Sequence, residues 1–313
     1  MNRCGVPPPE IARRLIDAQF PQWSHLPIEQ VPADGWDNRS FRLGREMVVR
    51  LPSAGEYASQ VEREQYWLPR LAQHLPVEIP TPLGIGHPAF GYPWRWSIRR
   101  WIEGETVRFD TAPAIAGDLA RFLIALQGID SSEGPTPGAH NFFRGGDLRT
   151  YDAETRKAIS MLGGRLDSAG TTRIWESALS SKWERAPVWL HGDVAAGNLL
   201  VRDGKLAAVI DFGNMAVGDP ACDLAVAWTL FPGDARSTFR AMLPFDDASW
   251  ARARGWALWK ALIVAAGLST TNAIELADPW HVIAEASKPL PPLPESPSAS
   301  PSTGTRSPAP RGS

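Results

Sequence analysis

Hydrophobic residues recur at two different spacings in the first hundred residues, and each spacing predicts a different kind of element. Residues 10–20 place apolar side chains three and four positions apart, which is typical of one helical face. Residues 40–44 and 46–52 predict a hairpin of two short strands. Residues 60–75 return to the helical spacing, with Pro69 as a break or as the start of a second helix.

A further strand is predicted where Trp94, Trp96 and Ile98 alternate with polar neighbours. The order strand, strand, helix, strand then indicates a small lobe that combines a sheet with helices. We assign this lobe to residues 1–103.

From Gly104 onward the spacing becomes mainly helical. Residues 112–129 contain an apolar stripe that ends at Gly128, a residue type that commonly terminates helices. Only residues 188–211 interrupt this part with strand-like patterns. We therefore expect a larger, mainly helical lobe over residues 104–287 with one inserted hairpin, and an α+β fold for the whole chain.

The remaining residues, 288–313, are rich in proline and serine and contain almost no large apolar side chain. Such a segment buries too little surface to offset the entropy lost on ordering, so we predict a disordered tail. Its "PLPPLP" run has the spacing of a docking peptide, but an incidental tail is the simpler interpretation.

Composition excludes several classes of function. The chain has a net charge of −2, which gives no basic excess for binding nucleic acid. It has no apolar stretch of membrane-spanning length and no N-terminal signal-peptide run, so we expect a cytoplasmic protein without membrane partners. Cys4 and Cys222 have no metal or redox spacing. The 14 tryptophans fall at scattered positions, which favours core packing over an aromatic ligand site.

The stretch "NLLVRDGKLAAVIDFG", residues 198–213, predicts a β-hairpin. Asp203 and Gly204 are a strong two-residue turn signal, because both positions of such a turn need positive φ. Arg202 then pairs with Lys205, and this pairing sets the register of the whole hairpin.

In this register Asn198 faces Val209, and Asp211 lies two residues further along the same strand. Diagonal neighbours of this kind are about 7–8 Å apart. An oxygen from Asn198 and one from Asp211 can therefore reach a single hard cation such as Mg²⁺. The apolar side chains expected on the opposite face are Leu199, Val201, Ala208 and Ile210.

Asp193 lies just upstream of this hairpin, before a loop of small residues. Beside a metal-bound phosphate, its carboxylate is well placed to accept a proton from an attacking hydroxyl group. We expect His191 to orient this loop by hydrogen bonding, although an isolated histidine is more often structural than catalytic.

Three segments together resemble the aminoglycoside phosphotransferase family of protein-kinase-like phosphotransferases: "HGDVAAGN" (191–198), "VIDFG", and "GDPACDLAVAW" (218–228). The resemblance covers about residues 25–285 and is strongest over 188–230. It implies a bilobal protein-kinase-like fold, with a small β-rich N-lobe and a larger, mainly helical C-lobe.

The resemblance also implies roles for individual residues. Asp193 is the expected catalytic base, assisted by His191, and Asn198 and Asp211 are the expected magnesium ligands. Asp223 is similar to a buried aspartate that supports the catalytic loop, and it also has the position of a helix N-cap. Asp219, in the same segment, is either a turn residue or a group near the acceptor.

In the N-lobe, Arg50 occupies the position where protein kinases have a phosphate-binding lysine. Arginine is able to bind phosphate through two hydrogen bonds, so the substitution is compatible with nucleotide binding. Its expected partner on the following helix is Glu64. Glu62, about 200° away around the helix, is the alternative.

The other segments expected to contact the nucleotide have weaker signals. Gly35, Asn38 and Ser40 lie where a phosphate-binding loop is expected, but the chain has no G-x-G-x-x-G pattern there. Backbone groups around Trp101 and Ile102 correspond to the family's hinge, where they would meet adenine.

The implied activity is transfer of the γ-phosphoryl group of ATP, with Mg²⁺, to a hydroxyl group of a small molecule. The acceptor stays open between an aminoglycoside or other antibiotic and a metabolite such as an amino alcohol, a sugar or an amino acid. The alternative to catalysis is a pseudokinase that binds nucleotide and engages a partner through its proline-rich tail.

A cationic acceptor would require acidic residues over the cleft. The candidates in the C-terminal part are Asp246, Asp247, Glu275 and Asp278, although a solvated helical surface explains these residues equally well.

Overall fold

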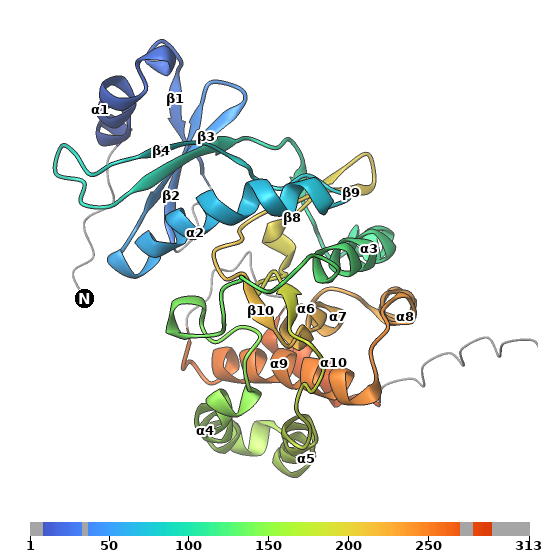
Figure 1. Ribbon diagram of the computed structural model, residues 1–313. Helices are drawn as coiled ribbons and strands as arrows, with labels where there is room; N and C mark the ends of the chain where they lie inside the picture. The colour runs from blue at the N-terminus through green and yellow to red at the C-terminus, as the bar shows by residue number, and fades with distance from the viewer. Residues whose placement is uncertain (1–8, 33–36, 270–277, 290–313) are drawn as a thin grey trace, which may run out of the picture.

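The computed structural model describes residues 9–32, 37–269 and 278–289. Within these residues the N-terminal part forms a five-stranded antiparallel sheet of order β1-β2-β3-β5-β4, with helix α2 (Gly55–Leu71) along one face (Figure 1). The strands are β1 (Ile28–Gln30), β2 (Asn38–Leu43), β3 (Met47–Pro52), β4 (Pro82–Gly86) and β5 (Trp96–Arg100).

Alternation along the central strands sends side chains to two different environments. Val49 of β3 and Ile98 of β5 are fully buried in an apolar cluster with helix α1 (Pro9–Gln19). Their neighbours Arg50 and Arg99 lie on the opposite face, where both contact α2 through a glutamate. The pleat of the sheet therefore separates an apolar core from a charged layer.

The predicted hairpin, first helix and third strand are present, but one expectation about α2 is wrong. The helix runs without interruption through Pro69 and ends at Leu71. Because Pro69 lies in the last turn, it removes a single helical hydrogen bond, and the cost is small enough for the helix to continue. The short strands β1 and β4 were not predicted, since neither has a clear alternation.

The C-terminal part is mainly helical, as predicted, and its helices surround the long helix α9 (Figure 1). The helices are α3 (Ala116–Gln127), α4 (Asp152–Leu162), α5 (Ser168–Leu179), α6 (Ala221–Leu224), α7 (Val226–Thr229), α8 (Gly233–Met242), α9 (Asp247–Ala265) and α10 (Pro279–Ser287).

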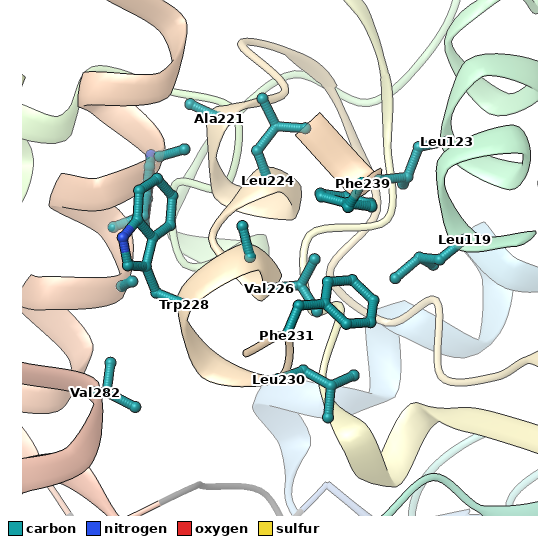
Figure 2. Packing of buried hydrophobic residues seen from close by; sticks show 14 of the residues in the cluster. Leu119, Leu123, Ala221, Leu224, Val226, Trp228, Leu230, Phe231, Phe239 and Val282 are labelled. Atoms are coloured by element: carbon teal, nitrogen blue, oxygen red, sulfur yellow. The ribbon is translucent and has the colours of Figure 1, made fainter. Parts of the chain in front are cut away.

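One apolar core joins these helices (Figure 2). Leu119 and Leu123 of α3 lie on the side of Phe239 of α8, and Trp228 of α7 lies toward α9. All four side chains are buried. Trp228 agrees with the expectation that the tryptophans fill the core.

Short strands are inserted into this helical part. Strands β7 and β10 pair with each other, and β8 and β9 form a hairpin whose outer edge is joined by β6. Their bounds are β6 (Glu105–Thr106), β7 (Val188–Leu190), β8 (Leu199–Arg202), β9 (Lys205–Val209) and β10 (Ala216–Gly218).

The turn of the β8–β9 hairpin is as predicted, but the register beyond it is not. Asp203 and Gly204 have φ values of 54° and 72°, and Arg202 pairs with Lys205. Further along, the pairing shifts by one residue, so that Leu199 faces Val209. The expectation that Asn198 faces Val209 is therefore wrong.

A bulge at Ala207 causes this shift. The Ala207 carbonyl accepts a hydrogen bond of 3.1 Å from the backbone N–H of Glu78, which belongs to the N-terminal part of the chain. A one-residue shift exchanges the faces of a strand. Leu199 is consequently buried in the helical core, whereas Ala208 packs with Ile102 on the other face. The predicted common face of Leu199 and Ala208 is wrong for the same reason.

Within the described part of the chain, no helix is long and apolar enough to cross a lipid bilayer. The predicted tail from residue 290 onward, and Cys4, lie outside the described residues.

Candidate functional site

A cleft of about 560 Å³ lies beside the loop that follows β7. Asp37, Asp193 and Asp211 line it, and so does one side of helix α9. The cleft therefore brings together an acid from the N-terminal sheet and two acids from the "HGDVAAGN" and "VIDFG" segments.

The buried carboxylate of Asp223 holds the start of this loop. Its two oxygens accept the backbone N–H groups of His191 at 2.7 Å and of Gly192 at 2.8 Å. Burial raises the pKa of Asp223, and these hydrogen bonds oppose the rise. Gly192 has a φ of 84°, and a Cβ there would lie 2.3 Å from the Asn214 carbonyl oxygen, so this turn requires glycine.

Both ring nitrogens of His191 are used within the loop. Nδ1 accepts the backbone N–H of Asp193 at 3.2 Å, and Nε2 lies 3.0 Å from the carbonyl oxygen of Ile210. A neutral imidazole with its proton on Nε2 satisfies both contacts. The ring also packs edge-on against Phe212. His191 thus links the loop to the end of β9 and has no ring nitrogen left for proton transfer.

The carboxylate of Asp193 is in a different situation. The residue's backbone is fixed, because its carbonyl accepts the Asn198 side-chain amide at 2.9 Å and its N–H donates to His191. Among the described residues, no group donates a hydrogen bond to the carboxylate itself, which lines the cleft. The loop therefore presents an anchored but unused acceptor to the cleft.

Asn198 and Asp211 come together by a route that differs from the predicted hairpin register. Asn198 ends a short 3-10 helix before β8, and its carbonyl accepts the N–H of Ile210 at 2.9 Å. Asp211 follows directly with a φ of 67°, outside the strand. One amide oxygen and one carboxylate are the hard ligands that Mg²⁺ prefers when nucleotide phosphates complete its shell, so this donor set fits magnesium.

Arg50 is the centre of a charged cluster on the N-terminal side of the cleft. Its guanidinium lies 3.2 Å from Asp211, 3.6 Å from Asp37 and 3.8 Å from Glu64. Burial raises the pKa of Asp211, but Arg50 more than offsets this and the pKa is lowered. Burial and the Asp211 charge raise the pKa of Asp37 to about 7.

Between the two candidate glutamates, Glu64 is the one near Arg50. It is 2% exposed, and its main partner is Arg99, which binds both carboxylate oxygens. Glu62 instead pairs with Arg95 at the surface. Sequence reasoning missed Arg99, because its position in a strand with apolar neighbours gives no sign of a buried charge.

The predicted hinge residues lie outside this cleft. The backbone N–H of Trp101 donates to the Glu46 carbonyl at 2.7 Å, so it is already engaged. Ile102 is buried against Leu200 and Ala208, where it joins the hairpin to the linker between the two parts. Their role as an adenine contact stays a prediction, and Gly35 of the expected phosphate loop lies outside the described residues.

Two open interpretations in the "GDPACDL" segment are resolved by contacts. Asp219 accepts the Nε–H of Arg252 at 2.7 Å and the N–H of Ala221 at 3.1 Å, so it is a turn residue and does not line the cleft. Asp223 does not cap the helix of Val226–Thr229, since its carboxylate accepts the N–H groups of His191 and Gly192. The expected N-cap role is wrong.

Of the acidic residues proposed to receive a cationic acceptor, the three that the structure describes do not line the cleft. Asp246 and Asp278 cap the N-termini of α9 and α10, and Asp247 is in the first turn of α9. Glu275 lies outside the described residues.

Sequence reasoning also missed the aromatic residues of the cleft. Trp256 and Trp259 of α9 line it together with Phe142 and Tyr151. The expectation that tryptophans serve core packing is therefore incomplete. The i, i+3 spacing of Trp256 and Trp259 places both on one helical face. This spacing was the sequence signal that could have indicated a shared aromatic surface.

Comparison with known proteins identifies a family and a fold. Residues 28–256 match the model of the phosphotransferase enzyme family, designated APH. A comparison with curated protein sequences finds no significant match.

Solved structures with this fold include the GDP complex of wild-type aminoglycoside 2'-phosphotransferase-IIIa. That structure has a TM-score of 0.67 and 18% identity, over 90% of this chain and 98% of the other. Macrolide 2'-phosphotransferase MphH from Brachybacterium faecium has a TM-score of 0.58 and 20% identity, over 89% of this chain and 97% of the other. These likenesses confirm the predicted bilobal kinase-like fold.

Proposed function

The chain belongs to the phosphotransferase enzyme family, and we propose that it transfers the γ-phosphoryl group of ATP to a hydroxyl group of a small molecule, with Asp193 as the catalytic base. The family resemblance predicted from the sequence is confirmed by the family match. The nucleotide, the metal and the residue roles are parts of the proposal.

The observation that best supports the proposal is the state of Asp193. Its backbone is held on both sides, by His191 and by Asn198, while its carboxylate faces the cleft without a hydrogen-bond donor from the described residues. A general base needs this combination of a fixed position and a free lone pair.

In the proposed reaction, Asp193 orients the acceptor hydroxyl group and takes its proton as the oxygen attacks the γ-phosphorus. The new O–P bond forms while the bond from the γ-phosphorus to the β,γ-bridging oxygen breaks, and ADP leaves with that electron pair. The proton on Asp193 is then released to water. Most of the rate enhancement comes from positioning and electrostatic stabilisation, as in other phosphoryl transfers.

Asn198 and Asp211 would hold the magnesium ion, which neutralises phosphate charge when bound. Arg50 would contact the nucleotide phosphates. Its guanidinium lies within 3.8 Å of three carboxylates, one of which is Asp211, and these contacts fix its position beside the proposed metal ligand. Asp223 and His191 position the loop and take no part in proton transfer.

The test is nucleotide consumption against a panel of hydroxylated compounds that includes aminoglycosides, sugars, amino alcohols and ring-bearing glycosides. We expect Asp193→Asn to lower kcat by about 10²–10⁴-fold while the Kd for nucleotide changes little. Asp234→Asn, the same change at an exposed acid of α8, is the matched control and should retain full turnover.

Retention of turnover in Asp193→Asn would remove the residue from its proposed role. Nucleotide binding without Asp193-dependent consumption on any acceptor would favour the pseudokinase interpretation instead.

A further inference from the structure

The side of the cleft formed by the C-terminal part is built from aromatic rings. Tyr151 stacks on Trp259 with ring centroids 3.9 Å apart and an interplanar angle of 27°. Trp256 meets both rings edge-on, at 5.5 Å from each. Trp256 and Trp259 are 3% and 5% exposed, so they present only ring edges to the cleft, whereas Phe142, which also lines it, is exposed. A flat ring of a ligand would therefore meet the Phe142 ring and the edges of the other aromatic residues there.

The backbone beside this cluster is strained. Phe142 and Phe143 are consecutive residues with φ values of 51° and 50°, a region that residues other than glycine seldom adopt. The hydroxyl group of Tyr151 donates to the Phe142 carbonyl and holds this conformation. Phe142 remains 47% exposed although it is aromatic. Such strain is retained where the surrounding structure requires a particular presentation of side chains.

The charges on this side of the cleft are unlike those of a site for polyamines. Arg144 and Lys260 line it, and Glu154 binds the indole N–H of Trp259. Asp193 and Glu154 are the acids that line this side within the described residues. The positive and negative charges therefore balance.

Arg144 is the cation best placed to receive a ligand. Its guanidinium lies 5.2 Å and 5.5 Å from the ring centroids of Trp256 and Trp259. Its Nε is buried without a hydrogen-bond partner, and none of its nitrogens has a carboxylate within ion-pair distance among the described residues. Its two Nη nitrogens are not among the buried unpartnered atoms, so they are the donors open to a charge-assisted hydrogen bond to a ligand oxygen in the cleft.

We propose that the acceptor is a hydroxyl compound with a flat ring system and an anionic or carbonyl oxygen, and that it is not a polyamine. The ring lies against Phe142 and the edges of Tyr151, Trp256 and Trp259, the oxygen accepts hydrogen bonds from Arg144, and the hydroxyl group reaches Asp193. That this compound is a phosphoryl acceptor rests on the proposed function. Its binding to the cleft can be measured whether or not phosphoryl transfer occurs.

The test is calorimetric titration of the nucleotide-free wild-type protein, in which no transfer occurs. The probes are 4-nitrophenyl β-D-glucuronide, which has a flat ring and a carboxylate, and kanamycin, which has several ammonium groups and no aromatic ring. We expect the glucuronide to bind at least about tenfold more tightly, the factor given by one charge-assisted hydrogen bond. Equal or tighter binding of kanamycin, or no measurable binding of the glucuronide, overturns the proposal.

Arg144→Gln should weaken binding of the glucuronide by about tenfold or more, and Arg144→Lys should weaken it less. Arg173→Gln, at an exposed arginine of α5 that does not line the cleft, is the matched control. Unchanged affinity in Arg144→Gln overturns the assignment. If Arg144→Gln does not fold, the glucuronide affinity of Arg144→Lys and the relative affinities of the wild type for the two probes still test the proposal.

Rapid phosphorylation of kanamycin would contradict this proposal and leave the phosphotransferase function intact. Glucuronide binding as expected, with no Asp193-dependent transfer to any acceptor, would contradict the function and leave the binding preference of the cleft.

Discussion

Arg50 and Arg99 share Glu64, and this arrangement differs from a single cation–carboxylate pair. Arg99 is 1% exposed and is bound by both oxygens of Glu64, while Arg50 lies 3.8 Å from the same carboxylate and 3.2 Å from Asp211. Glu64 therefore neutralises a buried arginine and leaves Arg50 closer to Asp211. The arginine that replaces the usual lysine is held by its planar, multiply donating head group.

Glu64→Gln should be strongly destabilising, because it leaves Arg99 buried beside an uncharged side chain. Loss of one partner of a buried ion pair costs about 3–5 kcal/mol. Glu62→Gln, two residues earlier at the surface, should change stability by about 0.5 kcal/mol or less. Urea unfolding of the two variants measures the difference, and equal losses would contradict the burial argument.

Asp37 should make the stability of the nucleotide-free protein depend on pH. Its pKa of about 7 in the folded protein lies above the unfolded value near 3.9, so the folded state binds the extra proton between these values. The free energy of unfolding should then fall as pH rises from 5 to 7. Asp211 does not add to this slope, because its lowered pKa keeps it ionised throughout.

Urea unfolding at pH 5 and pH 7 checks this dependence. The wild type should lose about 1–2 kcal/mol more than Asp37→Asn over this interval, given a limit of about 1.4 kcal/mol per pH unit for one group. The same pH dependence in both proteins would show that Asp37 titrates normally.

Among the elements, the loop of residues 191–198 depends on a close backbone approach. Gly192 turns the chain so that its N–H and that of His191 reach Asp223, and the Asn214 carbonyl fills the space where a side chain would begin. Asp193, Asn198 and Asp211 were recognisable from the sequence as candidate site residues, because they lie within a short motif of fixed spacing.

Gly192→Ala should lower kcat by about tenfold or more, since it forces the loop away from its position. It should also cost more stability than Gly204→Ala. Both glycines have positive φ, at 84° and 72°, but no atom lies within 4 Å of a Cβ at Gly204. The control should lose about 1 kcal/mol and keep its activity. Similar losses of activity in both variants would mean that crowding at Gly192 is unimportant.

The β8–β9 hairpin illustrates what sequence could not provide. The Asp203–Gly204 turn fixed the first pair correctly, but the bulge at Ala207 depends on Glu78, more than a hundred residues earlier. A long-range hydrogen bond of this kind leaves no local pattern. Asn198 and Asp211 were predicted to share a site through a register that the structure does not have, and their role as metal ligands stays a prediction.

At the scale of the whole molecule, the two parts are joined by several kinds of contact. Arg63 of α2 donates to the carbonyl groups of His140 and Gly213 in the C-terminal part. Glu78 pairs with β9, and β6 of the linker pairs with β8. The hairpin that leads to Asp211 is therefore held from both sides. The two-lobed fold was predictable from the change of hydrophobic period, whereas the boundaries of the lobes stay a prediction.

The composition of the acceptor cleft was not predictable, because it is assembled from distant segments. Phe142, Tyr151 and the tryptophans of α9 meet only in the folded chain. Two of the acidic residues that looked suitable for a cationic acceptor, Asp246 and Asp278, serve as helix caps instead. The position of an acidic residue in the sequence does not show whether it caps a helix or lines a cleft.

The most direct test of the central claim is ³¹P NMR of wild-type protein and Asp193→Asn with Mg-ATP and the panel compound that binds most tightly. Asp193-dependent phosphoryl transfer predicts one phosphomonoester formed for each ADP in the wild type, and neither product in the variant over the same time. ADP and inorganic phosphate without a phosphomonoester, or the same product at the same rate in the variant, would contradict it.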